Sequence, residues 1–320
     1  MPEIDLTGFQ PAEIDKLIQQ VLPSHDERED ELPEPPPAPV SRGGDLWQLD
    51  KHRILCGDAT KEDSWQRLMN NRKAAIVITD PPFGVRYSEI NNQRFNIKNG
   101  YILDTKHRQW EPLAGDENFD AAINSAAFIY ASLVGDGVAY VFCNSYLLIK
   151  FATWLNEHNI HYSPFLVWVK PGITISWQRY HPAHEFIIHS GPGSGTTGTN
   201  SRWFGDNSQS CIWELDVERQ GRLHPTQKPV EIYERALVNS SQRGELIVDC
   251  FFGSGTAVIA AEKLGRVCYG MEVDSAWVDV SVRRWENITS HEAILESTGQ
   301  TFSQVAEQRQ KSSEQVKQTA

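Results

Sequence analysis

Short apolar runs that alternate with helical patterns, from Trp47 to about Trp285, constrain the fold of this 320-residue chain more than any other feature. Each run has the length of a buried strand, and most are followed by a segment with helical spacing. This alternation predicts βα units around a mostly parallel sheet. The predicted strands are His52–Cys56, Ala74–Thr79, Val138–Cys143, Phe165–Val169, Phe186–His189, Leu246–Phe251 and Arg266–Val273.

Both ends of the chain differ in composition from this central region. Residues 4–22 have helical spacing, whereas residues 26–44 are acidic, then proline-rich, and predict a linker that forms no core. From residue 297 onward the chain is rich in Gln, Ser, Lys and Glu, which predicts a frayed end. The predicted organisation is an N-terminal tail over 1–44, an α/β domain over 45–290 and a polar C-terminal tail over 291–320.

The net charge of −12 is unusual for a protein that binds nucleic acid. Residues 1–44 carry ten acidic and three basic side chains, so that −7 of this charge lies in the tail and −5 in the rest. A charge of −5 excludes a histone-like binder, but it is compatible with an enzyme that meets DNA in one basic cleft.

Cysteine usage and hydropathy indicate a cytoplasmic protein. No run reaches the ~18 apolar residues of a membrane span, and the N-terminus has neither a basic start nor an apolar core of a signal peptide. The five cysteines form no CxxC pair and the histidines show no metal-ligand spacing, so we expect neither disulfides nor a metal site.

The motif with the sharpest chemistry is Asp80-Pro81-Pro82-Phe83, directly after the strand 74–79. Ligands of open α/β sheets bind at the carboxyl ends of strands. An exocyclic amino group on a base is a poor nucleophile, because its lone pair is delocalised into the ring. Asp80 and the Pro81 carbonyl could accept its two N–H groups, while Phe83 could stack on the base. The alternative is that the two prolines end a strand and Phe83 fills the core.

A second motif combines a strand, a glycine turn and a helix of small residues over 248–261, with Gly253-Ser254-Gly255-Thr256 as the turn. Glycines let a ligand approach the backbone, and the helix N-terminus favours an anionic group. Glu272, at the tip of the next predicted strand, is placed to accept both ribose hydroxyls of a nucleoside. A plain βα turn with a surface glutamate is the alternative.

Together these motifs resemble the permuted amino-group DNA methyltransferase family, in which the DPP-aromatic motif precedes the cofactor glycine loop. The resemblance covers about residues 45–285 and implies a doubly wound, mostly parallel, seven-stranded fold with one reversed strand, and S-adenosylmethionine as cofactor. It assigns cofactor contacts to Asp58, Thr79, Thr226, Lys228, Asp249, Phe251, Gly253, Ser254, Gly255, Thr256 and Glu272. Thr226 and Lys228 would bind the methionine carboxylate of the cofactor.

The junction over residues 32–55 is similar to that of phage methyltransferases fused to a ParB-like nuclease domain, which makes residues 1–22 a candidate remnant of that domain. Family members encode target recognition between the two motifs, here over about 171–223. The basic and aromatic side chains expected to contact DNA are Arg86, Lys170, Arg179, His181, Arg202, Trp203 and Arg222. An ordinary solvated insertion is the alternative for this segment.

The predicted function is methylation of a flipped base in double-stranded DNA, at adenine N6 because the motif begins with Asp rather than Ser. Cytosine-N4 methylation and an inactive DNA-binding relic of a mobile element are the alternatives. Glutamine or RNA methylation fits less well, since those relatives carry Asn at the position of Asp80. No Pro-Cys dipeptide is present, as carbon-5 cytosine methylation would require. Whether the chain forms a homodimer or accompanies a restriction enzyme stays open.

Overall fold

The computed structural model describes residues 29, 31–36, 38–82, 121–170, 179–195, 202–206, 208–215 and 228–319. These residues build one ten-stranded sheet with the order β10-β1-β2-β9-β8-β3-β4-β6-β5-β7. The strands are β1 (Leu46–Leu49), β2 (His52–Cys56), β3 (Ala74–Thr79), β4 (Leu133–Cys143), β5 (Leu166–Val169), β6 (His184–Ser190), β7 (Ile212–Glu214), β8 (Leu246–Asp249), β9 (Val267–Glu272) and β10 (Ile294–Leu295).

The sheet contains the predicted doubly wound core. Strands β2, β9, β8, β3 and β4 are mutually parallel, and β6 runs antiparallel between β4 and β5. These seven strands are the seven predicted from sequence, and β6 is the one reversed strand among them, which confirms the predicted fold. Three further strands extend the edges: β1 and β10 lie beyond β2, and β7 pairs with β5.

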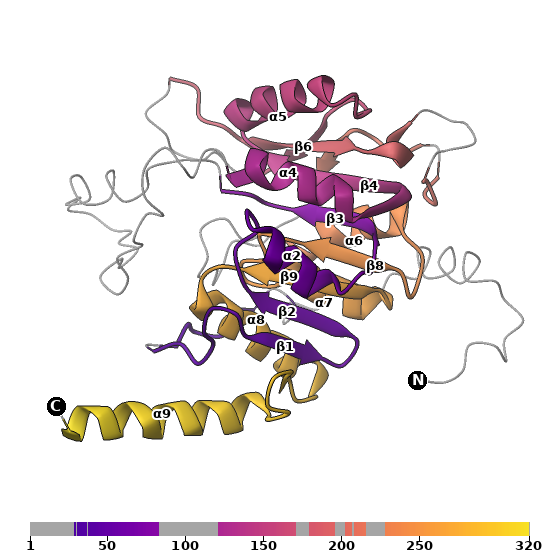
Figure 1. Ribbon diagram of the computed structural model, residues 1–320. Helices are drawn as coiled ribbons and strands as arrows, with labels where there is room; N and C mark the ends of the chain where they lie inside the picture. The colour runs from indigo at the N-terminus through magenta and orange to yellow at the C-terminus, as the bar shows by residue number, and fades with distance from the viewer. Residues whose placement is uncertain are drawn as a thin grey trace, which may run out of the picture.

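Helices cover both faces of the sheet (Figure 1). One face carries α2 (Glu62–Met69), α4 (Ala121–Ser132) and α5 (Ser145–Glu157), and the other carries α6 (Val230–Ser240), α7 (Thr256–Leu264) and α8 (Ser275–Thr289). All six residues of β3 are buried, as expected for a central strand between two helical layers. The strand ends before Pro81, whose ring nitrogen has no hydrogen for the ladder. The core therefore delivers Asp80 to the carboxyl edge of the sheet.

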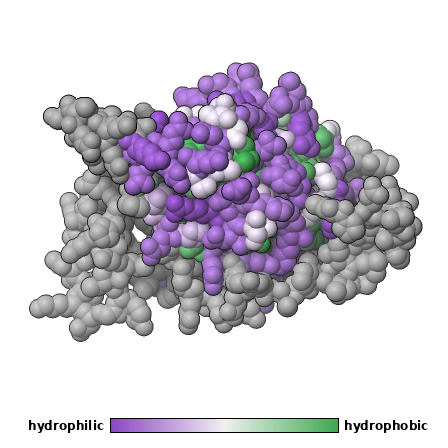
Figure 2. Space-filling view, turned by 90° about the horizontal axis from the view of Figure 1, so that it is seen from below, coloured by the Kyte–Doolittle hydropathy of each residue, from purple (hydrophilic) through white to green (hydrophobic). Residues whose placement is uncertain are grey.

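The C-terminal segment is ordered where its composition predicts fraying. Helix α9 (Phe302–Thr319) follows β10, and Phe302 and Val305 are buried in the core. The ring centroids of Trp47 and Phe302 lie 5.1 Å apart. From the side of α9, the described surface is largely hydrophilic, with only small separate hydrophobic patches (Figure 2). The prediction of a frayed end was wrong, because it weighed the polar majority of the segment and passed over its few apolar anchors.

The predicted linker also contacts the domain. The backbone N–H groups of Val40 and Ser41 donate to the buried carboxylate of Asp279 on α8, at 2.6 and 2.9 Å. The side chain of Trp47 donates to the Ser41 hydroxyl at 2.9 Å. The expectation that residues up to 44 form no core contact is therefore wrong from Val40 onward. Within the described part of the chain, no helix is long and apolar enough to cross a membrane.

Candidate active site

Four acidic residues stand at the carboxyl ends of four neighbouring strands. Asp58 follows β2, Glu272 ends β9, Asp249 ends β8 and Asp80 follows β3, in the order in which these strands lie in the sheet. The carboxyl edge of parallel strands is where ligands of such sheets bind. The structure thus brings together the acidic residues of the motifs that the sequence analysis singled out separately.

The glycine turn between β8 and α7 has two glycines with different roles. Both have a positive φ, 51° at Gly253 and 78° at Gly255, which disfavours other residues. A Cβ on Gly253 would meet no atom within 4 Å, so the backbone here borders open space. A Cβ on Gly255 would lie 2.9 Å from the side chain of Ser281. Gly253 is therefore the glycine that leaves room for a ligand, whereas Gly255 is required by the packing of the turn against α8.

Helix α8 holds the glycine turn in place. The Ser281 hydroxyl donates to the Gly253 carbonyl at 2.9 Å, and the Arg284 guanidinium donates to the Ser254 carbonyl at 3.0 Å. Arg284 also donates to the carbonyl of Glu29, at 2.5 Å. Sequence reasoning missed these two side chains. Their signal is polar residues spaced i, i+3 on the buried side of an otherwise apolar helix.

Glu272 ties the turn to the neighbouring strand. Its carboxylate accepts the Gly253 N–H at 2.7 Å and the Asp274 N–H at 2.9 Å. Burial raises the pKa of this carboxyl, although the two backbone N–H groups act to lower it. Its oxygens keep further lone pairs, so a hydroxyl pair entering beside Gly253 would find acceptors already fixed in position.

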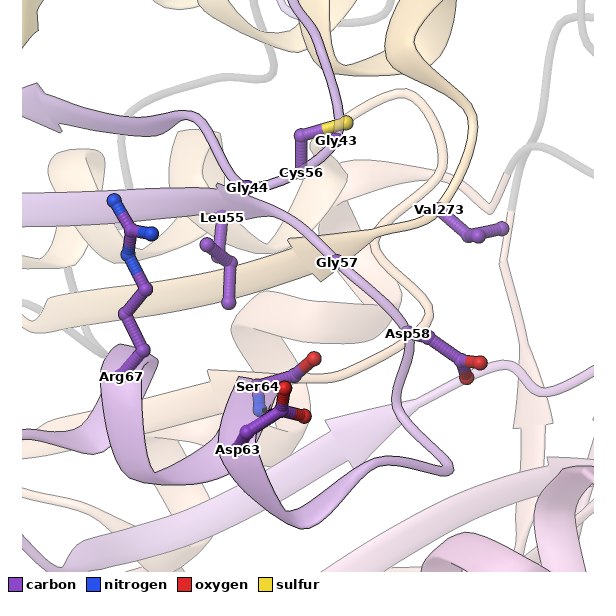
Figure 3. A pocket seen from close by; sticks show the side chains of 10 residues that line it. All are labelled: Gly43, Gly44, Leu55, Cys56, Gly57, Asp58, Asp63, Ser64, Arg67 and Val273. Carbon is purple, nitrogen blue, oxygen red and sulfur yellow. Dashed lines mark hydrogen bonds between the residues drawn. The ribbon is translucent and has the colours of Figure 1, made fainter.

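A cavity of about 330 Å³ opens where β2 ends, and it is lined there by Leu55, Cys56 and Gly57 and by Val273, the residue after β9 (Figure 3). Asp58 and Val273 stand at one end of it, and Asp63, Ser64 and Arg67 of α2 line another wall. The Asp58 carboxylate accepts the N–H and the hydroxyl of Thr60, at 2.9 and 2.8 Å. The size of the cavity and its mixed lining fit a nucleoside base that continues from a ribose held at Glu272.

Thr79 and Asp249 are placed differently from the prediction of cofactor contact. Both are fully buried, and the Thr79 hydroxyl donates to Asp249 at 2.7 Å, joining the ends of β3 and β8. The Phe251 N–H donates to the same carboxyl oxygen at 3.2 Å. Phe251 itself packs partly buried against the core on the α2 side. Thr79 and Asp249 therefore support the start of the glycine turn from within the core. Ser254 and Thr256 in the turn are buried as well.

The pKa of Asp249 supports a pH prediction for stability. Burial raises it to about 8, against the opposing hydrogen bonds from Thr79 and Phe251. Because the carboxyl of an unfolded chain titrates near 4, the folded state keeps a proton that the unfolded state loses, and stability falls as pH rises from about 4 to 8. Asp249→Asn removes this titration. We expect the melting temperature of the variant, relative to that of the wild type, to rise with pH up to about pH 8 and to stay constant above it. A difference in melting temperature that is the same from pH 5 to 9 would contradict this assignment.

Asp80 lies in a buried cluster of alternating charges. Its Oδ2 is 2.5 Å from the Lys228 ammonium, which is 2.9 Å from Oε2 of Glu185, and Glu185 also pairs with Lys170. Burial raises the pKa of Asp80 to about 6; Lys228 opposes this shift and Glu185 adds to it. The second oxygen, Oδ1, is buried and has no hydrogen-bond partner among the described residues. Buried carboxylate oxygens normally accept a hydrogen bond, so Oδ1 is available to accept one from a bound ligand.

Lys228 connects the two motifs. The Thr256 hydroxyl of α7 donates to the Lys228 carbonyl at 3.3 Å, while the Lys228 side chain reaches Asp80 and passes over the ring of Phe142 at 5.1 Å. The sequence analysis expected this ammonium at the methionine carboxylate of the cofactor, whereas the structure pairs it with Asp80 and Glu185. Glu185 was missed, although a glutamate inside the apolar run of β6 is a signal that could have been used.

Several predicted site residues lie outside the described residues, namely Phe83, Arg86, Arg222 and Thr226. Of the two motif prolines, Pro81 is buried and Pro82 is exposed. No group of three or more metal-ligating side chains occurs within the residues that the structure describes.

The predicted DNA contacts divide into two groups. Arg202 is 6% exposed; it binds Asp136 with two hydrogen bonds of 2.9 Å, pairs with Glu245, and donates to the Ser240 carbonyl at 2.9 Å. Its assignment to DNA is therefore corrected to an internal ion-pair hub. Lys170 is engaged with Glu185, and Trp203 is half-buried with its indole N–H on Asp206. Arg179 and His181 are exposed.

Comparison with known proteins decides the family. The DNA methylase family of N6 and N4 methyltransferases matches residues 74–283, which include the Asp80 motif, Lys228, the glycine turn and Glu272. The chain belongs to this family. Its members are amino-group DNA methyltransferases and use S-adenosylmethionine, as the resemblance implied.

Curated relatives are type II methyltransferases. M1.MboII of Moraxella bovis is 33% identical over 263 residues, covering 71% of this chain and 93% of the relative. M2.MboI of the same organism is 26% identical over 226 residues, covering 67% and 81%. Among solved structures, the cytosine-N4-specific PvuII DNA methyltransferase aligns with a TM-score of 0.53 at 15% identity, covering 79% of this chain and 93% of that one. This last likeness shows the fold alone.

The N-terminal segment matches a different unit from the one expected. Residues 3–43 match the helix-turn-helix domain of ParB-methyltransferases. This confirms the predicted association with ParB-type methyltransferases, and the matched unit is a helix-turn-helix domain where the sequence analysis expected a nuclease remnant and a linker. The matched range includes Val40 and Ser41, which the Asp279 carboxylate binds.

Proposed function

We propose that this protein transfers a methyl group from S-adenosylmethionine to the N6 amino group of an adenine flipped out of double-stranded DNA. The observation that carries the proposal is Oδ1 of Asp80, a buried acceptor at the tip of β3 that has no hydrogen-bond partner among the described residues and lies next to the strand that bears the glycine turn. Family membership supplies the DNA amino group as acceptor, and Asp80 supplies the atom that would receive it.

Asp80 would activate the target nitrogen by accepting one of its hydrogens. Oδ1 accepts one N–H and the Pro81 carbonyl accepts the other, which draws the nitrogen toward a tetrahedral geometry and frees its lone pair. Asp80 and Pro81 would thereby hold the nitrogen with its lone pair directed at the methyl group that the bound cofactor would supply. Ionisation makes Oδ1 the stronger acceptor, so transfer should decline as the pH falls below about 6, where Asp80 takes up a proton.

The cofactor would lie along the carboxyl edge from β3 to β2. When bound, S-adenosylmethionine supplies a methyl group already activated by its sulfonium charge. Gly253 leaves it room, Glu272 would accept the ribose hydroxyls, and the cavity that Asp58 and Val273 line at one end would take the adenine ring. The first turn of α7 offers backbone N–H groups to an anionic end. We place the segment of the protein that recognises the DNA target sequence over residues 171–223.

The test is direct identification of the methylated base. Purified protein is incubated with duplex DNA of mixed sequence and S-adenosylmethionine, and the DNA is digested to nucleosides for mass spectrometry. The expected product is N6-methyl-2′-deoxyadenosine. The N4-methylated cytosine nucleoside would replace the adenine assignment, and cofactor binding with no methylated nucleoside from any DNA would identify an inactive relic. Modification-sensitive sequencing of the same DNA then gives the recognition sequence.

A further inference from the structure

Activation of an amino group requires one carboxylate, yet Asp80 belongs to a cluster of four charged side chains with Lys228, Glu185 and Lys170. Glu185 is buried on β6, in register with Trp168 of β5 and one strand away from β4. It pairs with two ammonium groups, those of Lys228 and Lys170. Burying a carboxylate is costly unless it is paired, so a buried glutamate near the start of β6 calls for a reason.

We propose that Glu185 is a positioning residue for the methyl transfer: it holds the Lys228 ammonium so that this cation meets only one oxygen of Asp80 and leaves the other open to the target amino group. The inference rests on the proposed function and assigns a role within it. Glu185 acts through Lys228 and contacts no reacting atom.

The geometry supports this division of labour. Lys228 donates a hydrogen bond to Oδ2 of Asp80, at 2.5 Å, and forms an ion pair with Oε2 of Glu185, at 2.9 Å, which has no aligned hydrogen bond among the described residues. An ammonium has three donors, and a carboxylate on its far side keeps it from moving fully onto Asp80. Oδ1 is left without a partner in the described structure. Without Glu185, the ammonium would be free to neutralise both oxygens and weaken the acceptor that the reaction needs.

The rings around Lys228 restrict it further. Its ammonium lies 5.1 Å from the centroid of Phe142 and 5.9 Å from that of Trp168, both buried. Lys170 lies 5.5 Å from the Trp168 ring and engages the other oxygen of Glu185. With both carboxylates ionised, two cations balance two anions, so the buried cluster carries no net charge.

The titratable groups that face Asp80 define what each substitution should do. In the described structure they are Lys228, Glu185 and Lys170, together with Cys143 on β4, Tyr233 on α6 and Asp249 on β8. Removing the negative charge of Glu185 should lower the pKa of Asp80, because that charge acts to raise it. Removing the positive charge of Lys228 should raise the pKa of Asp80, because that charge acts to lower it.

The experiment measures the single-turnover rate of methyl transfer from pH 5 to 8.5, with saturating DNA and cofactor, for wild type, Glu185→Gln and Lys228→Met. In Glu185→Gln the acid limb of the profile should move down by about one pH unit. Its plateau rate should fall by about tenfold or more, with cofactor affinity unchanged. In Lys228→Met the limb should move up. Glu185→Gln keeps the shape of the side chain, so it tests the proposal even where Lys228→Met fails to fold.

Glu234→Gln is the matched control, because Glu234 is also buried and also paired with a lysine, Lys263, away from Asp80. Its acid limb should stay in place. A limb that is unmoved in Glu185→Gln, or a plateau equal to that of the wild type, would overturn the positioning role. Absence of transfer by the wild type on every DNA would instead overturn the proposed function, so the two failures are distinct.

Discussion

Replacing Asp80 with alanine is expected to slow methyl transfer by about 10²–10³-fold, the effect of removing a preorganised hydrogen-bonding group from a transition state. In the proposed function the carboxylate is the acceptor for the target amino group, and no described residue competes for its Oδ1. Cofactor affinity should change little, because Glu272, Gly253 and the cavity at Asp58 lie on the neighbouring strands. The measurements are single-turnover transfer and cofactor titration on the same preparation.

The control for this prediction is Asp80→Asn, which keeps the size of the side chain. Alanine removes the Asp80 partner of the buried Lys228 ammonium, so part of its effect is a loss of stability. The asparagine variant retains a carbonyl oxygen next to Lys228 and should fold, yet its acceptor carries no charge and transfer should remain severely reduced. Variants that are folded and transfer at the wild-type rate would show that Pro81 and Asp80 merely end β3.

The sheet could be predicted from sequence because each core strand can be recognised from its own residues. Each core strand is a short apolar run with a turn or a polar residue at its end, and all seven were found, two of them with the observed bounds, His52–Cys56 and Ala74–Thr79. The edge strands β1, β7 and β10 were missed, since β7 and β10 have only three and two residues and the apolar run of β1 is interrupted by Gln48. Helix α9 was missed for a related reason, because Phe302 and Val305 are few among polar neighbours.

The site was predictable as a set of strand tips, but not as a network of partners. The order of the motifs indicated which residues stand at the carboxyl edge, because strand ends are fixed by the fold. Which cation meets which carboxylate depends on contacts between segments far apart in the chain, such as Lys228 with Asp80, 148 residues away. Composition likewise favoured Arg202 as a DNA contact, whereas burial assigns it to Asp136 and Glu245.

Arg202 therefore offers the second large effect, on stability rather than on recognition. Arg202→Ala should lower the free energy of unfolding by about 2–3 kcal/mol, because the guanidinium makes charge-assisted bonds to Asp136, Glu245 and the Ser240 carbonyl, and because it fills space beside Phe204. Chemical denaturation measures this loss. Specificity of the folded fraction should be unchanged, since the buried side chain presents nothing to a groove.

Arg179→Ala is the matched arginine variant, because Arg179 is exposed and lies in the proposed recognition segment. Its stability should stay within about 0.5 kcal/mol of the wild type, while its affinity for DNA should fall. If Arg179 contacts phosphate, its loss would weaken binding to all duplexes alike and would reduce the slope of log K against log salt concentration by about one. A contact with a base would cost about 1–3 kcal/mol at one position of the site. Methylation of matched and singly mismatched duplexes at two salt concentrations separates these cases; the reverse pattern, with Arg202 needed for specificity and Arg179 for stability, would place recognition on the face that the structure assigns to the core.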